Sequence, residues 1–154
     1  MYSFAADSST GKISALKKLK TGLSSTSTPA VYKNRAYIGV MTENGGEVWV
    51  INAKTMKKIY SCSAPGYPQS SAIISKAYES KTGKIYVYFT CNSRNGELIC
   101  LADSEKATSG KAVTIYTPAK NNRQYCISPI AAAGDGTLYY KNDSGCIYAI
   151  CKRF

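Results

Sequence analysis

The length, composition and charge of this chain exclude several classes of protein. Its 154 residues suffice for one domain with a hydrophobic core, and 44% hydrophobic with 19% charged residues argue against a disordered chain. No run approaches the roughly 20 apolar residues of a membrane-spanning helix, so we expect no transmembrane segment.

The formal charge of +11 arises from 20 Lys and Arg against 9 Asp and Glu. Such a balance suits a nucleic acid, an anionic wall polymer or a membrane surface, but it also suits a lysine-rich surface that only keeps the protein soluble. The first residues lack the charged start and apolar core of a signal peptide, and we expect the chain to be a piece of a longer protein.

Short strands separated by turn residues recur along the whole chain. In chain order we expect two strands in 1–20, four strands at 27–33, 34–40, from 46 and at 57–62, four more at 69–75, 83–89, from 96 and at 112–117, and three at 127–133, 136–142 and from 145. Turns such as "ENGGE" and "SRNGE" contain Asn-Gly, which tolerates the positive φ of tight hairpins.

The repeating unit is therefore a group of four short strands. The glycines that open its third strand, Gly46, Gly96 and Gly145, are 50 and 49 residues apart. The strands "EVWVI" and "KIYVYF" are apolar on both faces, so each sheet must be packed on both sides. Sheets of four strands that pack radially on two neighbours predict an all-β fold of the β-propeller type.

Two stretches carry a resemblance to a known family. "AADSSTGKI" (Ala5–Ile13) and "AGDGTLYYKNDSGCIYAI" (Ala133–Ile150) resemble the repeats of quinoprotein-type propellers, which are related to proteins that bind pyrroloquinoline quinone. The second copy departs from the repeat, with Asn52 at the Asp position and Met56 at the Gly position. The tryptophan that usually follows this turn is replaced by Ala15 and Tyr60.

The number of blades is smaller than a closed propeller needs. We predict one β-propeller segment over 1–154, with blade parts at 1–20, 28–62, 70–117 and 127–152, or about three blades. Closed propellers have four to eight blades. We therefore expect a partial propeller or a segment of a larger one, which forms homo-oligomers or associates with further blades through its exposed edge.

The residues offer little for catalysis. The chain contains no histidine, which is the commonest general base, and its nine acidic residues lie in predicted turns. The resemblance implies a quinone site with a tryptophan floor, a calcium site and often adjacent cysteines, and the chain contains a single tryptophan, Trp49, and no adjacent cysteines. We therefore expect no catalytic residue, no metal and no cofactor, and we interpret Trp49 as packing between blades, like Ile99 and Tyr148.

The six cysteines lack the spacing of a zinc site. We expect them to be mostly buried free thiols, which behave as small hydrophobic side chains. A disulfide between Cys91 and Cys100, on either side of one predicted hairpin, is the alternative.

Two surfaces are candidate binding sites. Propellers that this chain resembles bind partners on one face, where we expect the residues Tyr67, Gln69, Arg94, Arg123 and Tyr125. The turns of the opposite face should form a basic surface made by Lys12, Lys54, Lys57, Lys58, Lys81, Lys84, Lys106 and Lys111. A protein or an anionic polysaccharide would fit; nucleic acid is disfavoured because these turns contain few aromatic residues.

The sequence thus favours a non-catalytic binding or scaffolding module. Its resemblance to quinoprotein-type propellers implies a bacterial protein that is extracellular or at the cell surface. The alternative is a segment of a larger quinoprotein-like or glycan-active propeller enzyme, with catalytic residues outside this chain. A subunit of an assembly machine, comparable to outer-membrane assembly lipoproteins with similar blades, is a third interpretation.

Overall fold

The computed structural model describes residues 1–151 and consists mainly of antiparallel β-strands. The all-β class that the sequence predicts is confirmed. Four sheets follow one another along the chain, and they are formed by β1 (Tyr2–Ala6) and β2 (Ile13–Lys18); β3 (Ala30–Tyr32), β4 (Arg35–Thr42), β5 (Gly45–Asn52) and β6 (Lys57–Ser63); β7 (Ile73–Ser75), β8 (Ile85–Thr90), β9 (Leu98–Asp103) and β10 (Ala112–Tyr116); and β11 (Ala131–Ala132), β12 (Leu138–Lys141) and β13 (Ile147–Ile150).

Each sheet is a meander in which strands adjacent in sequence are also adjacent in the sheet. Two sheets contain the four strands of the predicted repeat, and the sheet of β11, β12 and β13 contains three. A short helix, α1 (Glu79–Thr82), lies between β7 and β8, and a single 3-10 turn, Lys120–Asn122, follows β10. Among the described residues no helix has the length and apolarity to cross a membrane.

The hydrogen bonds and backbone conformation of the turns explain why Asp or Asn and Gly recur at fixed positions in the repeat. Asp7 and Asn52 each accept hydrogen bonds from the backbone N–H groups two and three residues later, which closes the turn between the third and fourth strands. Gly11 follows with a φ of 67°, and Met56 at the equivalent place has a φ of 56°. Met56 thus keeps the left-handed conformation that glycine adopts more easily, with its side chain buried.

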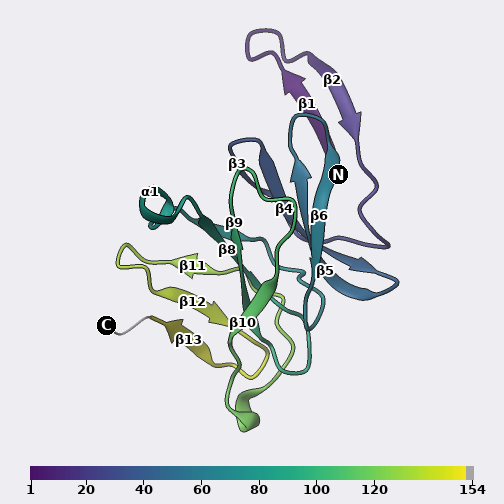
Figure 1. The fold of residues 1–154 in the computed structure, drawn as a ribbon. Coiled ribbons are helices and arrows are strands. Elements are labelled where there is room, and N and C mark those ends of the chain that lie inside the picture. The colour runs from purple at the N-terminus through teal and green to yellow at the C-terminus, as the bar shows by residue number, and fades with distance from the viewer. Residues whose placement is uncertain (152–154) are drawn as a thin grey trace.

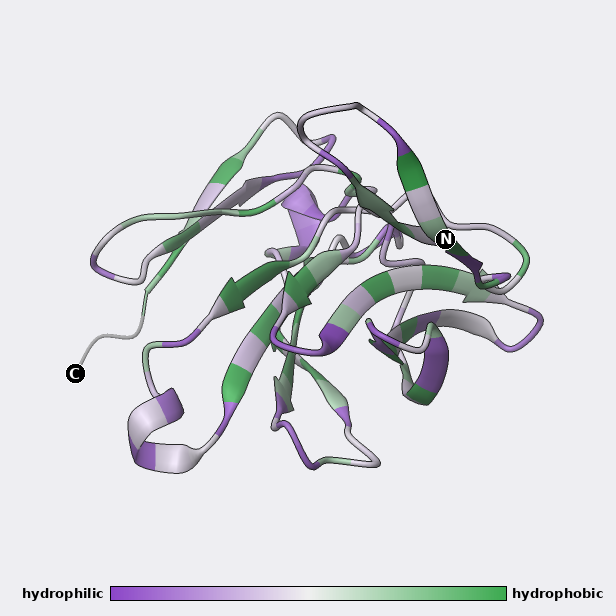
Figure 2. Cartoon of the chain, turned by 90° about the horizontal axis from the view of Figure 1, so that it is seen from above, coloured by the Kyte–Doolittle hydropathy of each residue, from purple (hydrophilic) through white to green (hydrophobic). Residues whose placement is uncertain are grey.

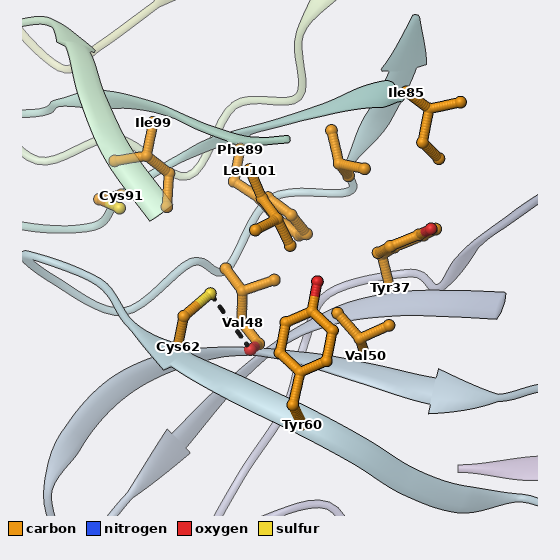
Figure 3. Packing of buried hydrophobic residues seen from close by; sticks show 11 residues of the cluster. Tyr37, Val48, Val50, Tyr60, Cys62, Ile85, Phe89, Cys91, Ile99 and Leu101 are labelled. Carbon is orange, nitrogen blue, oxygen red and sulfur yellow. Dashed lines mark hydrogen bonds between the residues drawn. The ribbon is translucent and has the colours of Figure 1, made fainter. Parts of the chain in front are cut away.

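The two four-stranded sheets and the three-stranded sheet stack face to face, whereas the hairpin of β1 and β2 projects from them (Figure 1). Between the two four-stranded sheets, Tyr37, Val48 and Val50 pack against residues of β8 and β9 such as Phe89 and Leu101. Figure 3 shows these side chains pointing toward one another from the two sheets. Figure 2 shows that apolar residues are concentrated along the strands while the turns are largely hydrophilic.

The second four-stranded sheet is packed on both faces. Its other face contributes Leu98, Ile73 and Tyr88 to a cluster with Tyr140 and Tyr148 of the three-stranded sheet. The expectation that a strand apolar on both faces must lie between two neighbours is therefore confirmed for β8 and β9.

Trp49 lies on the face of the first four-stranded sheet that points away from the second one. It is half-buried beside Met1 and Leu19, and its indole N–H donates to Glu47 Oε2 at 2.7 Å. The equivalent residues Ile99 and Tyr148 are buried between sheets. Trp49 therefore packs on this face beside the chain N-terminus rather than between two stacked sheets, which differs from the predicted position between blades.

All six cysteines are free thiols. Cys62, Cys91, Cys100 and Cys126 are buried, whereas Cys146 is half-buried and Cys151 is exposed. The prediction of buried free thiols is confirmed for four of the six, and the alternative disulfide between Cys91 and Cys100 is not formed.

Candidate functional site

A cleft lies where the turns of the two four-stranded sheets meet. It has a volume of about 450 Å³, and its rim is formed by Tyr32 at the end of β3, Lys33 of the β3–β4 turn, Glu79 of α1, and Glu105 of the β9–β10 turn. Arg35 and Asp103 also line the cleft, and both are almost completely buried. The cleft therefore has a buried charged floor and a more exposed charged rim.

The floor is an ion pair between the two sheets. Arg35 Nε donates to Asp103 Oδ2 at 2.7 Å, and Arg35 Nη2 donates to Asp103 Oδ1 at 3.2 Å. The same guanidinium donates to the carbonyl oxygens of Glu105 and Ala107 at 3.0 and 2.9 Å. Two charges that are paired in this bidentate way and further hydrogen-bonded can be buried without a large net cost.

Two tyrosines complete this network. The hydroxyls of Tyr37 and Tyr60 each donate to the Asp103 carboxylate at 2.7 Å. Burial, and secondly the hydrogen bond to Asp103, raise the pKa of both phenols well above the ordinary value. Both therefore remain neutral donors at physiological pH, and the network is suited to holding two sheets together rather than to transferring protons.

The rim joins the same two sheets at the surface. Lys33 Nζ lies 2.8 Å from Glu79 Oε1 and 3.9 Å from Glu105 Oε2, and the Tyr32 hydroxyl donates to Glu79 Oε2 at 2.6 Å. The hydrogen bonds from Lys33 and Tyr32 lower the pKa of Glu79. Lys33 is held in the turn with a φ of 51°, an uncommon conformation for a residue other than glycine.

The residues predicted to form the basic surface lie in or beside turns, except Lys81, which the structure places in α1 rather than in a turn. Lys12 is in the β1–β2 turn and Lys54 in the β5–β6 turn, while the others are Lys57, Lys58, Lys81, Lys84, Lys106 and Lys111. All eight are exposed, and none forms an ion pair with another residue of the described chain. The ammonium group of Lys58 lies 4.3 Å from the centre of the Trp49 ring.

The predicted ligand-binding residues at the other end of the strands differ in their accessibility. Tyr67 is only 8% exposed, and its hydroxyl accepts a hydrogen bond from the Thr26 N–H at 2.9 Å, so its ring is not available for stacking. Gln69 contacts Asn92 and lies 3.5 Å from Thr26 Oγ1, which places it within the same loop packing.

The remaining three residues of that group are exposed. Arg94 lies in the β8–β9 loop, and Arg123 and Tyr125 lie in the segment between β10 and β11. These two loops touch, since a Cβ on Gly96 would lie 2.4 Å from the Gln124 carbonyl oxygen. The structure thus brings Arg94, Arg123 and Tyr125 onto neighbouring loops and leaves Tyr67 buried.

The sequence analysis did not find the Arg35–Asp103 network. It placed Asp103 with Asp7 as a turn residue, but Asp103 lies seven residues after Gly96 whereas Asn52 lies six residues after Gly46. Because side chains alternate along a strand, the extra residue places Asp103 on the face of Ile99 and Leu101, which points at the neighbouring sheet. The difference of one residue between these two spacings was the sequence signal that could have revealed the network.

No metal site can be assembled from the described residues, because no group of three His, Cys, Asp or Glu side chains is suitably placed. No protein-family model matches the chain, and no curated protein matches it either.

Proposed function

We propose that this chain is a segment of a quinoprotein-type β-propeller and acts as a non-catalytic module that binds an anionic polysaccharide. In this proposal the four sheets are successive blades, covering 1–20, 28–62, 70–117 and 127–152, in an arc completed by further blades or another copy; residue 152 lies outside the described residues. Support for the architecture comes from the meander order of the sheets and from the packing of the second four-stranded sheet on both faces.

The binding proposal is carried by the eight exposed lysines of the basic surface. Their positive charges have no acidic partner among the described residues, whereas Lys33 and Arg35 nearby are paired with Glu79 and Asp103. Unpaired charges on one surface attract a polyanion at long range, and their attraction weakens as salt screens it. A polysaccharide ligand agrees with an extracellular or cell-surface location, which rests on the family resemblance.

Heparin chromatography tests the proposal. We expect the protein to bind heparin at low ionic strength and to elute at high salt. The triple variant Lys54→Gln, Lys84→Gln, Lys106→Gln removes charge from three separate turns and should elute at a clearly lower salt concentration.

The matched control removes the same charge elsewhere. Lys18→Gln, Lys20→Gln, Lys120→Gln changes three exposed lysines outside the basic surface, and it should elute close to the unmodified protein. Flow-through of the unmodified protein at low salt would overturn the proposal. Equal shifts for the two triple variants would also count against it, since they would indicate attraction by net charge alone.

A further inference from the structure

The N-terminal hairpin exposes an apolar surface. Tyr2, Phe4 and Ile13 are 59%, 54% and 63% exposed, and Leu16 lies in the bulge opposite Phe4; these four residues are called the hairpin patch. Figure 1 shows the hairpin of β1 and β2 projecting from the rest of the molecule. A two-stranded hairpin has little stability alone, and apolar side chains on its surface favour a contact that covers them.

The last sheet also has an uncovered apolar face. The cross-strand row Ala131, Tyr139 and Ala149 lies on it together with Ile147, which is 76% exposed; these four residues are called the terminal-sheet patch. The solvent face of an antiparallel sheet is normally polar, and Lys141 is the charged residue here. Within the described part of the chain, the free edge of β13 pairs with no strand.

The two patches cannot meet within one molecule. The hairpin precedes the first four-stranded sheet, and the three-stranded sheet packs on the far side of the second. Figure 1 shows the hairpin and the three-stranded sheet on opposite sides of the molecule.

The contacts inside the molecule show which faces fit each other. Each stacked sheet has a forward face, which contacts the next sheet along the chain, and a backward face, which contacts the preceding sheet. In both inter-sheet clusters, a forward face packs on a backward face. The terminal-sheet patch is on the forward face of the last sheet, since Tyr140 and Tyr148 occupy its backward face. Phe4 lies three residues before Asp7, as Trp49 lies three residues before Asn52, so Phe4 and Trp49 occupy equivalent positions. Because Trp49 is on the backward face of its sheet, the hairpin patch corresponds to a backward face.

The charges of the two elements are also complementary. The hairpin from Tyr2 to Lys18 contains three lysines and one aspartate, whereas residues 131–150 contain one lysine and two aspartates, Asp135 and Asp143. In a chain with a formal charge of +11, the last sheet is thus a locally acidic element. Opposite charges at the rim of a contact favour the correct orientation of the partners.

We infer that the hairpin patch of one copy covers the terminal-sheet patch of a second copy, in a head-to-tail contact that continues the stacking of the sheets. The inference rests on the blade arrangement of the proposed function. When two copies make this contact twice, they close a ring of eight sheets, which lies within the four to eight blades of closed propellers.

Sedimentation velocity measures the association. The unmodified protein should sediment as a dimer at micromolar concentration, and more completely at higher salt, because screening reduces the repulsion between two strongly positive copies. Phe4→Ser with Ile13→Ser, and separately Tyr139→Ser with Ile147→Ser, should each raise the dissociation constant at least tenfold. The control Val31→Ser with Val113→Ser changes exposed apolar residues outside both patches and should stay dimeric.

Cysteine crosslinking tests the direction of the contact. In a Cys151→Ser background, Phe4→Cys and Ile147→Cys proteins should form a disulfide-linked dimer when mixed under mild oxidation. Each protein alone should give little dimer, because a head-to-tail contact does not bring two copies of one patch together. A monomer at every salt concentration would overturn the inference, and so would crosslinks confined to unmixed proteins.

The heparin experiment separates the two proposals. None of the eight lysines of the basic surface belongs to either patch, so a patch variant that becomes monomeric should still bind heparin. Retention of heparin binding by a monomeric wild-type protein would refute the head-to-tail contact alone. Loss of heparin retention in a protein that remains dimeric would refute the polysaccharide proposal alone.

Discussion

Asp103 links two sheets through three side chains of its neighbour. Arg35 and Tyr37 on β4 and Tyr60 on β6 all donate hydrogen bonds to its carboxylate. A buried carboxylate with so many donors contrasts with Asp7, which only closes its own exposed turn. At the scale of single residues, two aspartates at similar places in the repeat therefore have different structural roles: Asp103 connects two sheets, and Asp7 stabilises a turn.

Replacing Asp103 tests how much this link contributes. In Asp103→Ala the Arg35 guanidinium stays buried without its counter-charge, so the free energy of unfolding should fall by about 3–5 kcal/mol. Chemical denaturation with guanidinium chloride measures this loss. The control Asp7→Ala removes an exposed turn carboxylate and should be clearly milder; equal losses in the two variants would contradict the role given to Asp103.

The elements are held in register by close approaches of the backbone. The connection between β6 and β7 crosses the first four-stranded sheet so closely that a Cβ on Gly39 of β4 would lie 1.7 Å from the Pro68 carbonyl oxygen. The same connection also approaches Gly46, whose Cβ would lie 2.0 Å from the Gly66 carbonyl oxygen. The equivalent of Gly46 in the second sheet is Gly96, which Gln124 approaches in the same way. A Cβ on Gly145 in the last sheet would meet no atom within 4 Å, consistent with a sheet that has no following connection among residues 1–151.

A pair of glycine variants tests this at the scale of elements. Gly39→Ala forces a methyl group against backbone atoms, and such overpacking should lower the free energy of unfolding by about 1–3 kcal/mol. Gly134→Ala meets no atom within 4 Å and should change it by less than about 0.5 kcal/mol. Thermal and denaturant unfolding of both variants provide the comparison, and a Gly39→Ala protein as stable as Gly134→Ala would refute the crossing.

The whole molecule buries ionisable groups in both inter-sheet cores. Burial raises the pKa of the Cys62 and Cys100 thiols to about 11 and that of the Cys91 thiol to about 12. Burial likewise raises the pKa of Tyr88 to about 12. These groups come from both four-stranded sheets, so their ionisation is linked to the unfolding of the whole stack.

Stability should therefore fall at alkaline pH. The folded state favours the protonated thiol, whereas the unfolded chain releases its proton near the ordinary pKa of 9.0. Above about pH 9 the unfolded state binds fewer protons, and the folding equilibrium constant should fall about tenfold per pH unit for a thiol such as Cys91 until the pH reaches about 12. Urea midpoints measured in reductant from pH 8 to 11 test this; Cys91→Ala should show a shallower fall, and a midpoint independent of pH would contradict it.

The strand positions and their grouping were predictable from the sequence. Asn-Gly turns and short apolar runs are local signals, and local backbone preferences largely decide where a strand begins and ends. The glycines 50 and 49 residues apart then group the strands into repeats. The prediction that the cysteines are mostly buried free thiols followed in the same way from their apolar neighbours, and four of the six are buried.

Only the tertiary structure decided which faces of the strands meet. One additional residue in β9 turns Asp103 from a turn cap into the centre of a buried network, and the packing of a loop buries Tyr67, which the sequence placed on an open surface. The stacking order likewise determines that the hairpin and terminal-sheet patches have no cover within the described chain. The physical reason is that a strand's sequence sets its alternation, whereas a shift of one residue and the approach of distant segments set what each face contacts.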